Sequence, residues 1–144
     1  MDTAESTAEL GWISSILKKN TVEKGSPYDW IPENDIHVSD EGVVINIKNP
    51  EWAKFTDTNS MDPVIDIDSN AIQIIPESED MIHIGDIVSY KSRYAEGTII
   101  HRVIRIGTDE DGWYAIMKGD NLKQEDPGKV RFSQIKRVLV AVIY

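Results

Sequence analysis

The chain has 144 residues and a mass of 16.3 kDa, which is the size of one domain built around one hydrophobic core. Hydrophobic residues make up 40% and charged residues 28% of the sequence, so a wholly disordered chain is excluded. A net charge of −10 without a strongly basic patch argues against nucleic-acid binding. The absence of cysteine excludes disulfides, thiolate metal sites and a cysteine nucleophile.

Residues 1–40 differ in character from the rest and are expected to form an N-terminal appendage. Glycine and proline at 25–27 and 31–34 predict a loop or extended segment after a helix. The helix is short and amphipathic and ends near residues 18–20, because four aliphatic residues have helical spacing: Leu10, Ile13, Ile16 and Leu17. We expect three tryptophans to pack this appendage onto the rest of the chain: Trp12, Trp30 and Trp52.

Residues 41–144 are expected to form a mainly β domain, because short β-branched runs alternate there with Gly, Pro, Asn and Asp. The acidic sequence at 109–112 ends in glycine and is typical of a hairpin turn. The expected strands cover residues 43–47, 71–75, 86–91, 98–106, 113–118 and 138–144.

The sequence carries neither a secretory signal nor a membrane-spanning segment. The first ten residues are acidic, and the longest apolar run, at 138–144, has seven residues where a spanning helix needs about 20. We expect a cytoplasmic protein if this chain is complete. If an anchor is missing from it, we expect a membrane-associated protein with an extracytoplasmic catalytic domain.

Three features carry side chains capable of chemistry, and each has a simpler alternative. Ser60 lies in a polar turn before a proline, where an ordinary turn is the alternative. His101 lies in an apolar strand, where it is either a neutral base or a hydrogen-bonded core histidine. The loop after residue 118 is an acidic solvated loop or a weak site for a hard cation, with three carboxylates: Asp120, Glu125 and Asp126.

The order of these features indicates acyl transfer. Ser60, His101 and Asp126 supply a nucleophile, a base and an orienting carboxylate, which are the groups that serine-dependent hydrolysis requires at neutral pH. No organic cofactor and no metal are implied, because Gly-rich phosphate loops and the spacing of a calcium loop are missing.

Four sequence boxes, in the right order, resemble those of type I signal peptidases. Residues 60–63 (Ser-Met-Asp-Pro) resemble the nucleophile box, and residues 85–88 (Gly-Asp-Ile-Val) resemble a strand of the family. Residues 100–103 (Ile-His-Arg-Val) resemble the box of the archaeal and endoplasmic-reticulum branch, which has His where bacterial enzymes have Lys. Residues 118–121 (Lys-Gly-Asp-Asn), with Asp126 following, resemble the last box of that branch. The resemblance covers about residues 56–144.

The resemblance implies a role for each matched residue. Ser60 would be the nucleophile, His101 the general base and Asp126 the acid that orients the histidine, with Asp120 the second choice for that acid. The Ser60 backbone N–H and the hydroxyl of Thr58 would form the oxyanion hole. Together with Thr58, the substrate-contacting residues of the nucleophile turn would be Asn59 and Met61.

The resemblance also implies a fold and a substrate class. The fold would be the coiled β domain that signal peptidases share with LexA-like self-cleaving repressors. Substrates would be extended peptide segments of exported or membrane-associated precursors, with small side chains just before the cut. This sequence departs from the family at Asn59, where the family has Gly, and at Leu122, where it has a second Asn.

Two other functions stay open. A LexA-like self-cleaving regulator is disfavoured because that class prefers a lysine base and a DNA-binding head, whereas residues 1–40 offer one helix and net acidity. A catalytically degenerate, peptide-binding module of the same fold is disfavoured by the retention of the serine, the histidine and both aspartates.

Overall fold

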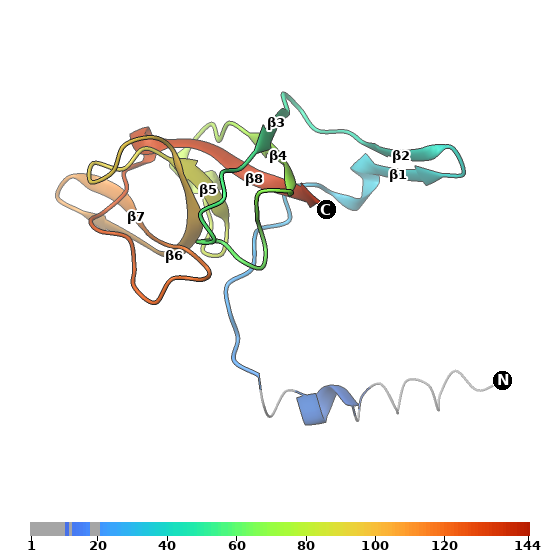
Figure 1. Cartoon of the computed structure of the whole chain (residues 1–144), viewed down its shortest axis with the longest axis horizontal. Helices are drawn as coiled ribbons and strands as arrows, with labels where there is room; N and C mark the ends of the chain where they lie inside the picture. Colours follow the sequence, from blue (N-terminus) through green and yellow to red (C-terminus); the bar gives the residue numbers. More distant parts are fainter. Residues whose placement is uncertain (1–10, 12, 18–20) are drawn as a thin grey trace.

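The computed structural model describes residues 11, 13–17 and 21–144, and this part of the chain is mainly β (Figure 1). The prediction of a mainly β protein is confirmed. A two-stranded hairpin consists of β1 (Ile36–Ser39) and β2 (Gly42–Ile45). A six-stranded antiparallel sheet has the order β3-β4-β8-β5-β6-β7. Its strands are β3 (Glu51–Lys54), β4 (Asn70–Ile74), β5 (Ile87–Tyr90), β6 (Ile99–Asp109), β7 (Gly112–Lys118) and β8 (Ile135–Ile143).

All six expected strands are present with shifted ends, but β1 and β3 were not predicted. The sequence of β3 is Glu-Trp-Ala-Lys, which has no β-branched residue, and its strand structure comes from pairing with β4 at the sheet edge. The expected hairpin turn is confirmed, since Asp109 pairs with Gly112 where β6 turns into β7. The described residues also contain three 3-10 helices: η1 (Glu33–Asp35) comes directly before β1, η2 (Glu79–Met81) lies between β4 and β5, and η3 (Phe132–Gln134) lies between β7 and β8.

Part of the expected N-terminal helix is described. Residues 11 and 13–17 are helical, and Ile13, Ile16 and Leu17 are exposed. Leu10, Trp12 and residues 18–20, to which the same prediction extends, lie outside the described residues.

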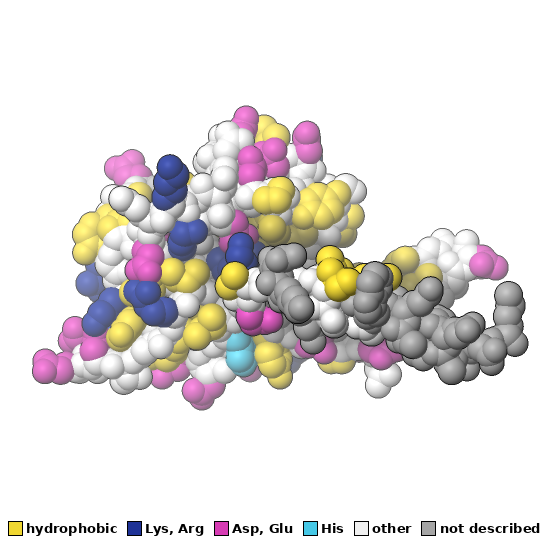
Figure 2. All heavy atoms as spheres, turned by 90° about the horizontal axis from the view of Figure 1, so that it is seen from below, with side chains coloured by type: hydrophobic (Ala, Val, Ile, Leu, Met, Phe, Trp, Pro, Cys, Tyr) yellow, Lys and Arg dark blue, Asp and Glu magenta, His cyan; other side chains and the backbone are white. Residues whose placement is uncertain are grey.

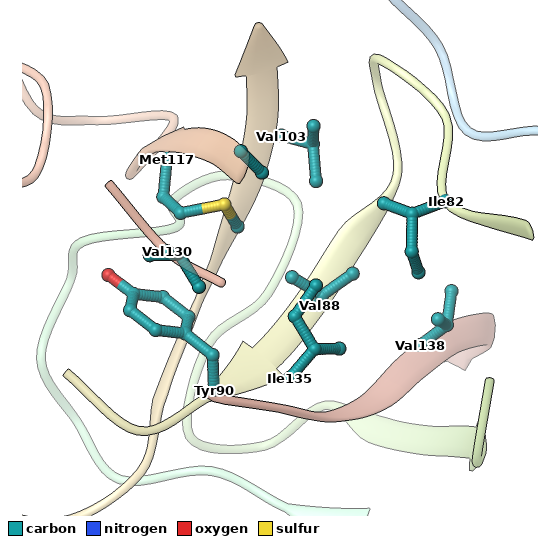
Figure 3. Close-up of a cluster of buried hydrophobic side chains, with 9 residues drawn as sticks. Ile82, Val88, Tyr90, Val103, Met117, Val130, Ile135 and Val138 are labelled. Atoms are coloured by element: carbon teal, nitrogen blue, oxygen red, sulfur yellow. The ribbon is translucent and has the colours of Figure 1, made fainter. Parts of the chain in front are cut away.

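Two clusters of buried side chains form the core. The first cluster, drawn in Figure 3, joins strands β5, β6, β7 and β8, with Val88, Val103 and Met117 fully buried. The second cluster contains Met61, Ile65 and Ala71. Met61 and Ile65 come from the segment between β3 and β4, and Ala71 comes from β4. Alternation along the strands explains the division, because neighbouring residues of one strand point to opposite faces of the sheet.

A buried carboxylate attaches the segment before β1 to the six-stranded sheet. Asp86 has no exposed surface, and its oxygens accept from the Tyr28 N–H, the Trp30 Nε1–H and the His83 N–H at 2.8–2.9 Å. The indole of Trp30 packs against the first cluster, and Tyr28 stacks on His83. Trp52, by contrast, is 64% exposed. The domain boundary expected at residue 40 falls in the turn between β1 and β2, which pair as one hairpin.

The hairpin is amphipathic and projects from the six-stranded sheet (Figure 1). Cross-strand partners share a face, so the pairs Ile36–Ile45 and Val38–Val43 place four aliphatic side chains on one side. All four are exposed. The other side carries His37 and Ser39 together with their partners Val44 and Gly42, which are exposed as well.

No helix in the described part of the chain combines the length and the apolar character needed to cross a bilayer.

We predict that Asp86→Ala lowers the free energy of unfolding by about 3 kcal/mol, because three buried N–H donors lose their acceptor. Chemical denaturation followed by tryptophan fluorescence measures the change. The matched control is Asp80→Ala, which removes an exposed carboxylate and is expected to stay within about 0.5 kcal/mol of wild type. Equal stability of the two variants would contradict the role of Asp86.

Candidate active site

Ser60 lies in a tight turn that is held on both sides. Its neighbour Met61 is 3% exposed and belongs to the second core cluster. Its other neighbour, Asn59, has a φ of 56°, in the left-handed region that only Gly and Asn adopt readily. The asparagine that replaces the glycine of the resembled family therefore suits this backbone. Asn121 donates from its backbone N–H to the Ser60 carbonyl at 2.9 Å and from its amide to the Asn59 carbonyl at 3.0 Å.

His101 lies on β6 and contacts both Ser60 and Asp126. Its Nε2 is 3.1 Å from Ser60 Oγ, and its Nδ1 is 2.6 Å from Asp126 Oδ2. The ring is on the same face of the strand as Val103 and is 7% exposed. The three candidate residues, far apart in the sequence, thus form one continuous chain of contacts.

Asp126 reaches the histidine from the loop between β7 and η3. Its backbone N–H donates to the Met117 carbonyl at 2.8 Å, which fixes the loop beside β7. Oδ2 accepts a second side-chain hydrogen bond from the Tyr90 hydroxyl at 2.5 Å. Burial alone would raise the pKa of Asp126, but the hydrogen bonds from His101 and Tyr90 outweigh it and hold this pKa below the usual carboxyl range.

Asp120, the second choice for the orienting acid, lies elsewhere. Both of its oxygens are paired with Arg102, at 2.8 and 2.6 Å. Arg102 follows His101 in β6, so its side chain points to the opposite face of the strand. Arg102 also donates to the Gly85 carbonyl at 2.7 Å. The pair ties the loop after β7 to the loop before β5, and the carboxylate at the histidine is that of Asp126.

The three carboxylates considered for a hard cation have separate partners. Asp120 pairs with Arg102, Glu125 with Arg105, and Asp126 with His101. They therefore do not converge on a common point. On the face drawn in Figure 2, the Lys and Arg side chains lie toward one half, and Asp and Glu side chains lie among them and across the rest of the face.

Two groups able to donate a hydrogen bond lie beside the Ser60 hydroxyl. The Thr58 hydroxyl is 3.2 Å from Ser60 Oγ. Within the described residues, no acceptor takes the backbone N–H of Ser60. Both groups belong to the turn of the serine itself, so they have a fixed position relative to its hydroxyl.

An open groove of about 960 Å³ contains the serine and the histidine. Residues 53–56 and 58–61 line it together with residues 96–101 at the start of β6. Gln73, Arg137 and Ser89 come from β4, β8 and β5, the strands between β3 and β6 in the sheet. Thr58, Asn59 and Met61 are among the lining residues.

Three residues of the site were missed in the sequence. Tyr90 was expected only as part of a strand, and Asn121 only as part of a resembled box. Gly119 allows close packing, because a Cβ there would lie 2.6 Å from the Ser60 carbonyl oxygen and 3.0 Å from His101 Nε2. A glycine beside a predicted catalytic loop was the one available signal for such an approach.

Comparisons with protein-family models, with curated proteins and with solved structures found no match to this chain. The function of the chain is therefore inferred from its residues and their geometry.

We predict that Arg102 and Asp120 are energetically coupled. Their side chains are only 16% and 18% exposed, so a double-mutant cycle with Arg102→Gln and Asp120→Asn should give a coupling of about 1 kcal/mol or more. Arg105, also on β6, pairs with Glu125 in similar geometry, but these side chains are 59% and 43% exposed. The coupling of this second pair should be close to zero. Equal couplings for the two pairs would contradict the assignment.

Proposed function

We propose that the chain is a serine endopeptidase that uses Ser60, His101 and Asp126 as a nucleophile–base–acid relay. The observation that carries this proposal is the unbroken path from Ser60 Oγ to His101 Nε2 at 3.1 Å and from His101 Nδ1 to Asp126 Oδ2 at 2.6 Å. Both distances are those of hydrogen bonds, and the first is short enough for a proton to pass from the serine to the base.

The tautomer of the proposed base follows from the charge of its neighbour Asp126. An ionised Asp126 only accepts, so Nδ1 of His101 carries the proton and Nε2 presents its lone pair to the Ser60 hydroxyl. Ser60 Oγ attacks the peptide carbonyl carbon while its proton passes to Nε2. The imidazolium, stabilised by Asp126, then gives this proton to the leaving amine nitrogen as the C–N bond breaks.

The second half of the reaction repeats these steps with water. His101 takes a proton from a water molecule, which attacks the acyl-enzyme ester and releases the carboxylic acid product and free Ser60. In both halves the carbonyl oxygen becomes an oxyanion. The Ser60 N–H and the Thr58 hydroxyl are the donors that would stabilise it, and one such donor is typically worth about 10²–10³ in rate.

The substrate class follows from the groove and from the resemblance of the four sequence boxes. An extended peptide would lie along residues 53–61 and 96–101, with its scissile bond at Ser60 and small side chains before the cut. The fold would be that of the archaeal and endoplasmic-reticulum branch of signal peptidases, and the substrates would be exported or membrane-associated precursors. The protein would then act at a membrane surface on its extracytoplasmic side.

We predict that Ser60→Ala lowers peptide hydrolysis by at least about 10³-fold and leaves the thermal transition nearly unchanged, because the hydroxyl supplies chemistry rather than core packing. Hydrolysis of a library of extended peptides, followed by mass spectrometry, measures the loss. The control is Ser133→Ala, an exposed serine in η3, which should cleave as wild type does. Cleavage by Ser60→Ala at the wild-type rate would overturn the proposal, and peptide binding without any cleavage by wild type would favour a degenerate binding module.

We predict that the rate of hydrolysis rises with pH around the value of about 6.5 at which an imidazole ordinarily titrates. The base must be neutral, so activity is lost as the pH falls and the imidazole takes up a proton. Because the pKa of Asp126 lies below the usual carboxyl range, its carboxylate stays ionised through this region and does not cause the loss. A profile of kcat/KM that is flat between about pH 5 and 8 would exclude a histidine base.

A further inference from the structure

A tyrosine that the relay does not include is bonded to its acid. The hydroxyl of Tyr90 donates to Asp126 Oδ2 at 2.5 Å, and this is the same oxygen that His101 Nδ1 contacts at 2.6 Å. Tyr90 comes from β5 and His101 from the neighbouring β6, so two adjacent strands point two donors at one acceptor.

The position of this hydroxyl is set by packing. The side chain of Tyr90 is 1% exposed, and Figure 3 shows its ring among the aliphatic side chains of the first cluster with the oxygen pointing away from Val138. Burial, together with the neighbouring carboxylate, raises the pKa of Tyr90 above its usual value, so the hydroxyl keeps its proton and stays a donor. The ring fixes the oxygen where only Asp126 takes its hydrogen bond among the described residues.

We propose that Tyr90 is a positioning residue that holds the Asp126 carboxylate and lowers the basicity of His101 through it. The meaning of this inference for catalysis rests on the proposed function. The titration of His101, by contrast, can be measured whether or not the chain is a peptidase. The Tyr90 hydrogen bond draws negative charge from Oδ2, so less of that charge is left to stabilise a protonated imidazole.

The direction of the effect on His101 follows because Tyr90 and His101 share one oxygen of Asp126. Without the Tyr90 hydroxyl, Asp126 has His101 as its one side-chain donor, and the carboxylate stabilises the imidazolium more strongly. His101 should then bind its proton at higher pH. At the same time the carboxylate loses one of its two anchors, so the imidazole is held less firmly toward Ser60.

Removing the Tyr90 hydroxyl leaves the other charged groups near His101 unchanged. The ion pairs Arg102–Asp120 and Arg105–Glu125 lie beside the loop that carries Asp126. The remaining charges line the groove or end the strand β7: Glu51, Lys54, Asp66, Glu96, Lys136, Arg137 and Lys118. A difference between the two proteins therefore reports the Tyr90 hydroxyl.

The test is Tyr90→Phe, which keeps the ring and removes only the hydroxyl. NMR of the imidazole carbon-bound protons, followed against pH, should show the titration midpoint of His101 moving up by about half a unit or more, while the midpoints of His37 and His83 stay in place. The control is Tyr114→Phe. Tyr114 lies on β7, and its ring packs under the ammonium group of Lys129. A midpoint of His101 that is unchanged or lower in Tyr90→Phe would overturn the proposal.

A measurement on wild type covers the case in which Tyr90→Phe fails to fold. The Tyr90 hydroxyl proton, protected by burial, should give a slowly exchanging NMR signal whose shift changes at the pH where His101 titrates. A shift that ignores this titration would overturn the proposal.

Activity separates this inference from the proposed function. If the chain is a peptidase, the acid limb of kcat/KM should move up in Tyr90→Phe together with the His101 midpoint, and KM should change little. If wild type and Ser60→Ala hydrolyse equally, the proposed function fails, whereas a moved midpoint still supports the coupling from Tyr90 through Asp126 to His101.

Discussion

One carboxylate oxygen, Oδ2 of Asp126, is the point on which the candidate site depends. It accepts from His101 and from Tyr90, and the two contacts outweigh the cost of burying the charge. An ionised carboxylate only accepts, so a neutral imidazole in this orientation donates from Nδ1 to Asp126 and turns Nε2 toward the Ser60 hydroxyl.

The loop after β7 brings the other parts of the site to this oxygen. At its start, Gly119 allows the loop to lie close to Ser60 and His101, and Asn121 donates to the carbonyl of Ser60. Further along, the N–H of Asp126 donates to the Met117 carbonyl near the end of β7. The ion pairs Arg102–Asp120 and Arg105–Glu125 attach the same loop to β6. This loop therefore contacts the turn of Ser60 through Asn121 and reaches His101 through Asp126.

Whether the sequence predicts a strand depends on whether a local pattern of residues or pairing with another strand makes it one. Strands rich in β-branched residues, such as β6 and β8, were found because their pattern is local. β3 was missed because only its pairing with β4 makes it a strand. In the candidate site, the residue types and their order were readable, but both Asp120 and Asp126 remained candidates for one role, since they lie in the same acidic loop and differ only in what they meet.

The sequence by itself determined the class of the chain, mainly β and acidic, and the set of chemical groups available to it, with no thiol among them. Only the tertiary structure decided which aspartate lies at His101, that Asp120 belongs to Arg102, and that a core tyrosine reaches the same carboxylate. The physical reason is that these contacts join residues 18 to 41 positions apart, so they depend on strand register and loop closure, which no local pattern encodes.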